Sequence, residues 1–345
     1  MEIQTATHDL QPRHAFRIAR RRTQPLRNVF LQITRDGTHG LGEASPNAYY
    51  KETAAGVLEK LGAASDWLRN LKMAGLPDLD RAWAESWEHV APSRAAQCAL
   101  DLALWDWLAR REGVSVAELA TGAAPRPVPT FCTIGLSTPE ELRTKVREMR
   151  GFPRIKIKSD AGADLTPVHY VRARCTGVLA VDANGAWAGA DVGALTSELA
   201  RLEIAFLEQP LPPAKDAQIP RLRSQLPIFA DESCVTEDDL PRLAKRFTGI
   251  NVKLVKCGGL TPALRMARNA RDIGLKTMIG CMLESSALIA AGCVAAQLTD
   301  HADLDGAWLL ANDPCAGWRF ERGILHPPAA TGLGVAAHPG ALVFV

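Results

Sequence analysis

Three short stretches decide the fold of this chain, because each brings a carboxylate to the end of an apolar run: Val181–Asn184 (VDAN), Leu207–Pro210 (LEQP) and Ala230–Ser233 (ADES). The carboxylates Asp182, Glu208 and Asp231 recur at intervals of about 25 residues, which is the length of one strand, one helix and two loops. A repeated unit of this kind is typical of parallel sheets. We therefore expect the three carboxylates at the same edge of one sheet.

Short β-like runs alternate with helical segments throughout the chain after Pro127. The eight runs are Thr130–Ile134, Ile155–Lys158, Leu179–Asp182, Ile204–Glu208, Ile228–Asp231, Ile250–Leu254, Thr277–Gly280 and Ala302–Asp305. Eight successive units predict an α/β fold, namely a (β/α)8 barrel of the TIM type rather than an open sheet. The active site of such a barrel lies at the C-terminal ends of its strands, so the polar residues found there are expected to converge.

The first third of the chain has a different pattern. The strand-like stretches Ala15–Ile18 and Val29–Ile33, followed by the turn signal Arg35–Gly37, predict a β-hairpin. Apolar residues recur at helical spacing from Thr53 to about Ala74 and again from Ser93 to Gly113, where the serine is a suitable N-cap. These residues are expected to form a small α+β unit.

Length and composition agree with two domains. The chain has 345 residues, with 40 Lys and Arg against 38 Asp and Glu, and 47% of its residues are hydrophobic. It is longer than the roughly 250–300 residues at which a single core stops growing. We expect an α+β unit over residues 1–125, the barrel over 126–316, and a C-terminal segment over 317–345 that returns to the N-terminal unit.

Charge and cysteine usage limit the partners and the compartment. A net charge of +2 argues against nucleic acid or an anionic membrane surface as the main partner. The N-terminus lacks the pattern of a signal peptide, and no apolar run is long enough to span a membrane. The eight cysteines form no C-x-x-C pair, so they are expected to be reduced and mostly buried, as in a cytoplasmic protein.

Three inward carboxylates at one end of a barrel favour a metal site. A single Asp at a strand end is more often a helix N-cap, but Asp182, Glu208 and Asp231 follow three consecutive strands. Like charges in a poorly solvated site repel each other strongly unless a cation lies between them. These strand ends offer oxygen ligands and neither His nor Cys, so the expected ion is Mg²⁺ rather than zinc.

Two further strands direct lysines into the same interior. In the run RIKIK at 154–158 the isoleucines share one face, so Lys156 and Lys158 share the other. A solvated basic edge strand is the alternative explanation of this run. In the sixth strand Lys253 has the inward parity, whereas Lys256 has the parity of the apolar face and is the weaker candidate. The sixth strand lies opposite the second in a barrel, so Lys158 and Lys253 are expected to face each other across a substrate.

A lysine pair beside a divalent metal suits removal of a proton α to a carboxylate. Such a proton is too weakly acidic for an amine at neutral pH unless the developing negative charge is stabilised electrostatically. The base must be a free amine, and Lys156 together with partial burial is expected to lower the pKa of Lys158. One base permits elimination or isomerisation, whereas two bases on opposite faces permit inversion at carbon, which is the simplest outcome.

A set of short motifs follows in order along nearly the whole chain. The motifs are Gly42–Ala44, Cys98–Asp106, Lys156–Lys158, Asp182–Asn184, Glu208–Pro210, Asp231–Ser233 and Asn251–Lys253 with Gly258-Gly259. In this order they resemble the enolase superfamily, in its muconate-lactonizing-enzyme subgroup. The resemblance implies a modified barrel under an N-terminal α+β capping domain, one Mg²⁺ per subunit, and Lys158 and Lys253 as an acid/base pair. It also implies supporting roles for Asn184 and, after the seventh strand, Glu284.

The eighth strand narrows the substrate. Asp303 and Asp305 share one face of this strand, where two carboxylates could hold an ammonium group. In the dipeptide epimerases of this superfamily a D-x-D at this point receives the free α-amino group of the substrate, and Asp303-Leu304-Asp305 is similar to it. A loop of acidic N-caps is the alternative. Thr133, near the end of the first strand, could offer its hydroxyl to the substrate, although a buried structural threonine is the simpler explanation.

The N-terminal unit is expected to supply specificity. Several arginines follow one another in Phe16–Arg22, and a guanidinium binds a carboxylate bidentately. The resemblance to L-Ala-D/L-Glu epimerases selects Arg21 as the contact for an acidic substrate side chain, and Lys156 joins the substrate-binding residues. A solvated arginine face is the alternative, and Arg20 and Arg22 are not distinguished from Arg21.

Together these features predict a Mg²⁺-dependent epimerase acting on the C-terminal residue of a dipeptide, most simply L-Ala-D/L-Glu from murein peptides. Alternatives within the fold are N-acylamino acid racemase, o-succinylbenzoate synthase and cycloisomerase, none of which needs an ammonium-binding pair. A non-catalytic binding protein is disfavoured, because the sets of carboxylates and lysines are complete. The expected partners are a small dipeptide and, in a homo-oligomer, further copies of the chain.

Overall fold

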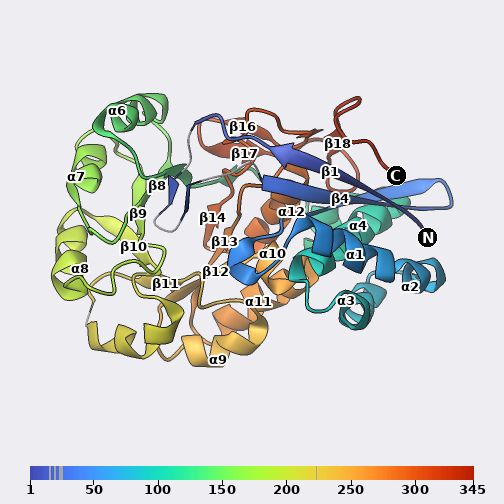
Figure 1. The fold of residues 1–345 in the computed structure, drawn as a ribbon, viewed down its shortest axis with the longest axis horizontal. Coiled ribbons are helices and arrows are strands. Elements are labelled where there is room, and N and C mark those ends of the chain that lie inside the picture. Colours follow the sequence, from blue (N-terminus) through green and yellow to red (C-terminus); the bar gives the residue numbers. More distant parts are fainter. Residues whose placement is uncertain (15–16, 19–20, 23–25, 223) are drawn as a thin grey trace.

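The structure is a computed structural model that describes residues 1–345 apart from 15–16, 19–20, 23–25 and 223; side chains are described outside 15–25 and 220–223. Figure 1 shows the two parts of the molecule, a long antiparallel sheet with its helices and a ring of parallel strands enclosed by helices. The eight-stranded sheet and the N-terminal antiparallel sheet agree with the predicted fold class.

An antiparallel sheet in the order β1-β4-β5 opens the chain. Its strands are β1 (Glu2–Leu10), β4 (Leu26–Arg35) and β5 (Thr38–Ala44), and the short pair β2 (Arg17–Ile18) and β3 (Arg21–Arg22) lies between β1 and β4 in sequence. Asp36 and Gly37, both with positive φ, form the turn between β4 and β5, which confirms a hairpin at this turn. The sequence prediction missed β1, and residues 17–18 pair with 21–22 instead of joining the hairpin.

Helices pack on this sheet. They are η1 (Ala48–Tyr50), α1 (Ala54–Ala63), α2 (Ser65–Asn70), α3 (Pro77–Val90), α4 (Arg94–Glu112) and α5 (Val116–Thr121). Helix α4 follows its predicted N-capping serine and is buried on all sides over most of its length. Gly40 and Gly42 of β5 allow the close packing, because a Cβ there would lie 2.1 Å from the Ala103 carbonyl oxygen and 2.0 Å from that of Ala99. Helix α3 was not predicted.

The second part is a parallel sheet of eight strands in sequential order. The strands are β7 (Cys132–Ile134), β8 (Arg154–Lys158), β9 (Val178–Asp182), β10 (Ile204–Glu208), β11 (Ile228–Ala230), β12 (Gly249–Lys253), β13 (Lys276–Gly280) and β14 (His301–Asp303). All eight predicted runs are strands, with small shifts at their ends. A hydrogen bond of 2.8 Å from the Phe131 N–H to the Ala302 carbonyl joins the first strand region to the last, so the sheet closes into a barrel.

Helices surround this barrel (Figure 1). They are α6 (Pro139–Glu148), α7 (Thr166–Arg172), α8 (Val192–Arg201), η2 (Pro213–Leu222), η3 (Glu237–Asp239), α9 (Leu240–Leu243), α10 (Leu254–Cys257), α11 (Leu260–Asp272), α12 (Ser286–Ala295) and η4 (Ala296–Leu298). The short helix α10 follows β12 directly, where a strand extending to Leu254 was predicted. This turn changes the direction of the side chains that follow Lys253.

The barrel interior is layered, because side chains alternate along each strand. One end is filled by an apolar cluster that we call the floor: Phe131, Ala180, Phe206, Phe229 and Met278. Two residues after Phe206 and Phe229 come Glu208 and Asp231, at the C-terminal ends of β10 and β11. We call this opposite end the mouth.

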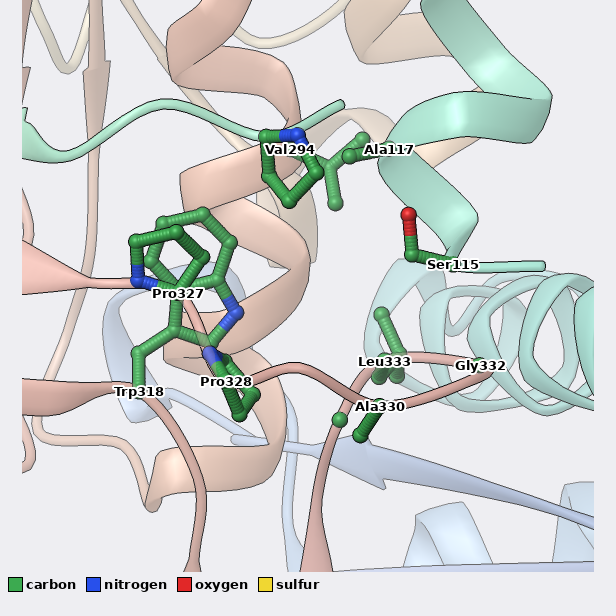
Figure 2. A pocket seen from close by; sticks show the side chains of 11 residues that line it. Ser115, Ala117, Val294, Trp318, Pro327, Pro328, Ala330, Gly332 and Leu333 are labelled. Atoms are coloured by element: carbon green, nitrogen blue, oxygen red, sulfur yellow. The ribbon is translucent and has the colours of Figure 1, made fainter. Parts of the chain in front are cut away.

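The C-terminal residues run back across the molecule. They include β15 (Cys315–Ala316), β16 (Arg319–Glu321), β17 (Ile324–His326) and β18 (Ala336–Ala337), and β17 pairs with β6 (Val128–Pro129). Val345 and Thr5 exchange two backbone hydrogen bonds of 3.0 Å, which place the last residue against β1. A small pocket lies among this segment, α5 and α12, where Trp318, Pro327 and Pro328 line it (Figure 2). Its lining has no ionisable side chain, so the pocket offers no acid or base.

Two further predictions concern the whole chain. All eight cysteines are free thiols, and seven of them are buried. Within the described part of the chain, no helix is both long enough and apolar enough to cross a membrane.

Candidate active site

Three carboxylates meet at the mouth of the barrel, as the sequence predicted. Asp182 and Glu208 are the last residues of β9 and β10, and Asp231 follows β11. Each offers an oxygen that lies within 4.8 Å of the other two, and all three side chains are buried. The convergence follows from the parallel register, in which Asp182 lies beside Glu208 on neighbouring strands.

Lysines surround this triad. Lys158, at the end of β8, places Nζ 2.5 Å from Asp182 Oδ2, and Lys253, at the end of β12, places Nζ 2.9 Å from Asp231 Oδ2. The two predicted bases therefore contact different carboxylates, on strands that lie on either side of the triad. Both side chains are less than a tenth exposed, which shields their ammonium groups from water.

Lys156 is more deeply buried and lies between the triad and the eighth strand. Its Nζ donates to Glu208 Oε2 at 3.1 Å and to Asp303 Oδ2. Burial by itself would lower the pKa of Lys156, but the carboxylates of Asp303 and Glu208 outweigh it, so the net shift is upward. Lys156 is therefore a fixed positive charge that holds two acidic groups in place.

The carboxylates respond differently to this environment. Burial raises the pKa of Glu208 to about 7, and the charge of Asp182 adds to the effect. Burial also acts to raise the pKa of Asp231, but the ammonium groups of Lys253 and Lys256 more than offset it, so that pKa falls. The lysines thus favour the ionised form of Asp231, whereas Glu208 is the carboxylate that is costly to ionise.

Lys256 was the weaker sequence candidate, and the structure explains its role. Because α10 begins directly after β12, the alternation of side chains along the strand does not extend to Lys256. Its side chain points into the protein instead of lying on the predicted apolar face. Its Nζ donates to the Asp231 carbonyl at 2.6 Å, to Asp231 Oδ1 at 2.7 Å and to the Asn251 carbonyl at 3.0 Å. All three donor positions are used, so Lys256 fixes Asp231.

Asp303, the last residue of β14, and Asp305 just beyond it are both buried, and Asp303 contacts Lys156. Asp305 Oδ2 accepts the backbone N–H of Thr133 at 2.6 Å, and burial with the neighbouring Asp303 charge raises the pKa of Asp305 to about 7. Asp303 Oδ1 is buried and accepts no hydrogen bond within the described part of the chain. The pair therefore keeps acceptor capacity for a cationic group.

Of the two predicted supporting residues, Asn184 lies next to the triad, whereas the charged neighbours of Glu284 are Glu43 and Lys253. Asn184, which has a φ of 45°, donates its backbone N–H to Asp182 Oδ1 at 2.8 Å and its side-chain amide to Glu232 Oε1 at 3.3 Å. Glu284 is buried, accepts the Met282 N–H at 2.8 Å, and has its pKa raised to about 8 by burial. Arg21 belongs to β3, but its side chain lies outside the described residues.

Two residues near the site were not predicted. Tyr50, at the end of η1, has a pKa that is raised by burial and by the charge of Asp231. Glu43 of β5 is fully buried and accepts hydrogen bonds from the Ser285 N–H, the Ser285 hydroxyl and the Leu288 N–H at 3.0, 2.5 and 3.1 Å. Glu43 belongs to the motif Gly42–Ala44 that contributes to the family resemblance, but the motif gave it no role in the site.

The donor set at the mouth fits a hard divalent cation. The triad supplies oxygen ligands from three consecutive strands, and because its carboxylates are buried, their like charges repel one another strongly without a counter-ion. Asn251 Oδ1 nearby is also buried and accepts no hydrogen bond from any described residue. Such a set suits Mg²⁺ and not a soft metal.

Comparison with known proteins gives the family. Residues 2–120 match the mandelate racemase / muconate lactonizing enzyme N-terminal domain, and residues 140–341 match a domain described as enolase C-terminal domain-like. The chain therefore belongs to the mandelate racemase and muconate lactonizing enzyme family of the enolase superfamily. The resemblance seen in its motifs is confirmed.

Several relatives are similar over almost their entire length. A hydrophobic dipeptide epimerase from Roseobacter litoralis is 36% identical to this chain, and the matched region covers 97% of this chain and 98% of the relative. An L-Ala-D/L-Glu epimerase from Escherichia coli is 35% identical over 90% of this chain and 95% of its own. The solved structure of a dipeptide epimerase from Methylococcus capsulatus, complexed with Mg and L-Arg-D-Lys, is 32% identical, with a TM-score of 0.86 over 97% and 98% of the two chains.

Proposed function

We propose that this chain is a Mg²⁺-dependent dipeptide epimerase, an isomerase that inverts the α-carbon of the C-terminal residue of a dipeptide. The observation that carries the proposal is the pair of lysines at Asp182 and Asp231, on opposite sides of one carboxylate triad. The dipeptide epimerase names of relatives that match this chain nearly end to end support it.

The two lysines divide the proton transfers. An α-carbon held between Lys158 and Lys253 presents its hydrogen to one Nζ and its opposite face to the other. One lysine, as the amine, takes the α-proton and leaves the electron pair of the C–H bond on the substrate, and the other, as the ammonium, returns a proton from the far side. The two epimers therefore lose their α-proton to different lysines.

The triad and the D-x-D pair fix the two ends of the dipeptide. Asp182, Glu208 and Asp231 would hold Mg²⁺, whose positive charge stabilises the negative charge that develops on the substrate carboxylate. Asp303 and Asp305 would bind the substrate ammonium group, and the free Oδ1 of Asp303 is one acceptor for it. Lys156 holds Asp303 from the opposite side.

The favoured substrate is L-Ala-D/L-Glu, of the kind released from murein peptides, with Arg21 as the contact for the glutamate side chain. Arg21→Ala then raises KM for L-Ala-L-Glu by about tenfold, the usual cost of losing a charge-assisted hydrogen bond, and leaves KM for L-Ala-L-Leu unchanged. Equal effects on both dipeptides would remove Arg21 from the proposal. The eight free thiols suit a reducing compartment, and we propose the cytoplasm.

The decisive experiment is α-deuteration. The purified protein is incubated in D₂O with Mg²⁺ and a library of L-Ala-L-X dipeptides, and mass spectrometry follows uptake of one deuterium in the C-terminal residue. Faster deuteration of dipeptides with an acidic C-terminal residue than of those with an apolar one supports the full proposal. Deuteration of apolar dipeptides alone would keep the epimerase assignment but change the proposed substrate to a hydrophobic dipeptide. Exchange of N-acyl amino acids without exchange of any dipeptide would establish the racemase alternative, because such substrates lack the ammonium group.

A further inference from the structure

A segment just beyond the catalytic lysine of β12 is held by the N-terminal domain. The segment Gly258–Thr261 comprises the two glycines between α10 and α11 and the first two residues of α11, and Asp101 of α4 binds its last residue twice. The backbone N–H and the hydroxyl of Thr261 donate to Asp101 Oδ2 and Oδ1 at 2.9 and 2.6 Å. The indole N–H of Trp105, one turn further along α4, donates to the same hydroxyl at 2.9 Å.

The start of the segment is held as well. The indole N–H of Trp83 in α3 donates to the Gly258 carbonyl at 2.9 Å. Both glycines have positive φ and touch α4 directly, because a Cβ on Gly258 would lie 2.5 Å from Gln97 Oε1 and one on Gly259 would lie 2.3 Å from Asp101 Oδ2. Helices α3 and α4 therefore hold both ends of the segment, and Asp101 supplies the carboxylate that binds Thr261.

Fixing this segment also fixes the turn of α10, which follows Lys253 directly and contains Lys256. The N–H groups of Gly258 and Gly259 donate to the Leu254 carbonyl at 2.9 and 2.8 Å, which closes the single turn of α10. Lys253 is the residue directly before this turn, and Lys256 within it binds Asp231. A shift of the segment would therefore move both groups that determine where Lys253 Nζ lies.

The opposite lysine has a different support. Ser159, the residue after Lys158, donates its N–H to the Asp182 carbonyl at 2.8 Å, and its hydroxyl accepts the Trp187 indole N–H at 3.1 Å. Both partners belong to the barrel itself. The two bases are thus anchored to different domains in the described structure.

We propose that Asp101, acting through Thr261, is a positioning residue for Lys253, so that the N-terminal domain sets one of the two proton transfers. The inference rests on the proposed two-base epimerisation. It predicts that weakening the Asp101–Thr261 contact slows proton exchange on the face of the substrate served by Lys253 and spares the face served by Lys158.

The test compares the two epimers of one dipeptide in D₂O. Initial rates of α-deuteration are measured separately for the L,L and L,D forms, and Lys158→Ala and Lys253→Ala assign each form to its lysine. Asp101→Asn and Thr261→Val are expected to lower exchange of the Lys253 epimer by about tenfold, since small misplacements of a reacting group have effects of this size or larger. Exchange of the Lys158 epimer is expected to stay within about twofold.

Two variants serve as controls. Thr261→Ser keeps the hydroxyl and should retain both rates. Asp106→Asn removes a carboxylate of the same helix that is equally buried but binds the N–H groups of Leu41 and Leu333, remote from the barrel mouth. It should change thermal stability without favouring one epimer.

The outcomes separate cleanly. Slower deuteration of the Lys253 epimer alone in Asp101→Asn and Thr261→Val supports the inference. If Asp101→Asn does not fold, the comparison of the two epimers in Thr261→Val is the test. Equal losses for both epimers, or no loss, overturn the positioning role while leaving two-base epimerisation intact. A wild-type protein that exchanges neither epimer of any dipeptide overturns the proposed function, and this inference with it.

Discussion

The mouth and the floor of the barrel are built by the same strands, two residues apart. On β10 the floor residue is Phe206 and the mouth residue is Glu208; on β11 the floor residue is Phe229, and the mouth residue Asp231 follows the strand directly. At the floor the rings of Phe206 and Phe229 pack with centroids 4.4 Å apart, and burial alone stabilises them. At the mouth, buried like charges meet within 4.8 Å of one another.

This difference separates stability from function along one strand. Burial of a large apolar side chain contributes about 1.5–3 kcal/mol, whereas burial of a charge is unfavourable unless a partner compensates it. The floor therefore stabilises the barrel, and this stabilisation offsets the unfavourable burial of ionised groups at the mouth. Substitutions at neighbouring positions are expected to affect different properties.

The largest effect is expected at the lysines. Lys253→Ala removes one of the two proposed proton-transfer groups, so the rate of epimerisation should fall by about 10³-fold, within the range known for general acid/base groups. The variant should still deuterate one epimer through Lys158, measured by mass spectrometry in D₂O. Unchanged epimerisation in Lys253→Ala would refute the two-base assignment.

The next largest effect is expected at the floor. Phe206→Ala opens a cavity beside Phe131 and Phe229 and should lower the free energy of unfolding by about 3–5 kcal/mol. Because the mouth retains its residues, kcat of the folded enzyme should change little. Urea denaturation and steady-state kinetics provide the two measurements, and a loss of kcat without a loss of stability would contradict the separation.

Glu208→Gln, two residues away on the same strand, should behave in the opposite way. It removes one negative charge from the triad, so the variant without Mg²⁺ should be no less stable than the wild type. Saturating Mg²⁺ should stabilise the wild type by about 2–3 kcal/mol at a hundredfold excess over Kd, and the variant hardly at all. Calorimetry with and without Mg²⁺ checks this, and an equal stabilisation of both proteins would place the ion elsewhere.

Sequence periodicity predicted the mouth well, because its residues follow local rules. The strand alternation of period two put Lys156, Lys158 and Lys253 inside, and the convergence of parallel strand ends placed Asp182 beside Glu208. The prediction for Lys256 was wrong because the strand ends at Lys253 and the helix α10 begins at the next residue, so the alternation of side chains along a strand no longer applies. A helical turn of four residues leaves no periodic signal in a sequence.

Contacts between the domains could not be predicted in this way. Asp101 meets Thr261 across 160 residues of chain, and Glu43 meets Ser285 across 242. Each looked like one polar residue in an apolar element, and only the packed structure supplies its partner. Strand β1 was missed because its alternation of polar and apolar residues is weak, with just Ala6 and Leu10 buried.

The smallest expected effect is the pH dependence of folding stability that arises from a histidine at the floor. His301 packs against Phe206 with centroids 5.4 Å apart, and its Nδ1 accepts a hydrogen bond of 3.1 Å from Arg154, which has only donors. Burial, with the charge of Arg154, lowers the pKa of His301 to about 4. Between the ordinary value of 6.5 and this lower value the unfolded chain binds the additional proton, so stability falls as the pH falls through that window.

His301→Gln removes this proton uptake. The difference in unfolding free energy between pH 7 and pH 5 should shrink by about 1 kcal/mol relative to the wild type, because the ring is partly exposed and the effect is screened. His39→Gln, the same substitution at an exposed position on β5, is the matched control. If His301→Gln keeps the wild-type slope in urea titrations at the two pH values, the acid sensitivity arises at the mouth, and the floor contributes apolar packing alone.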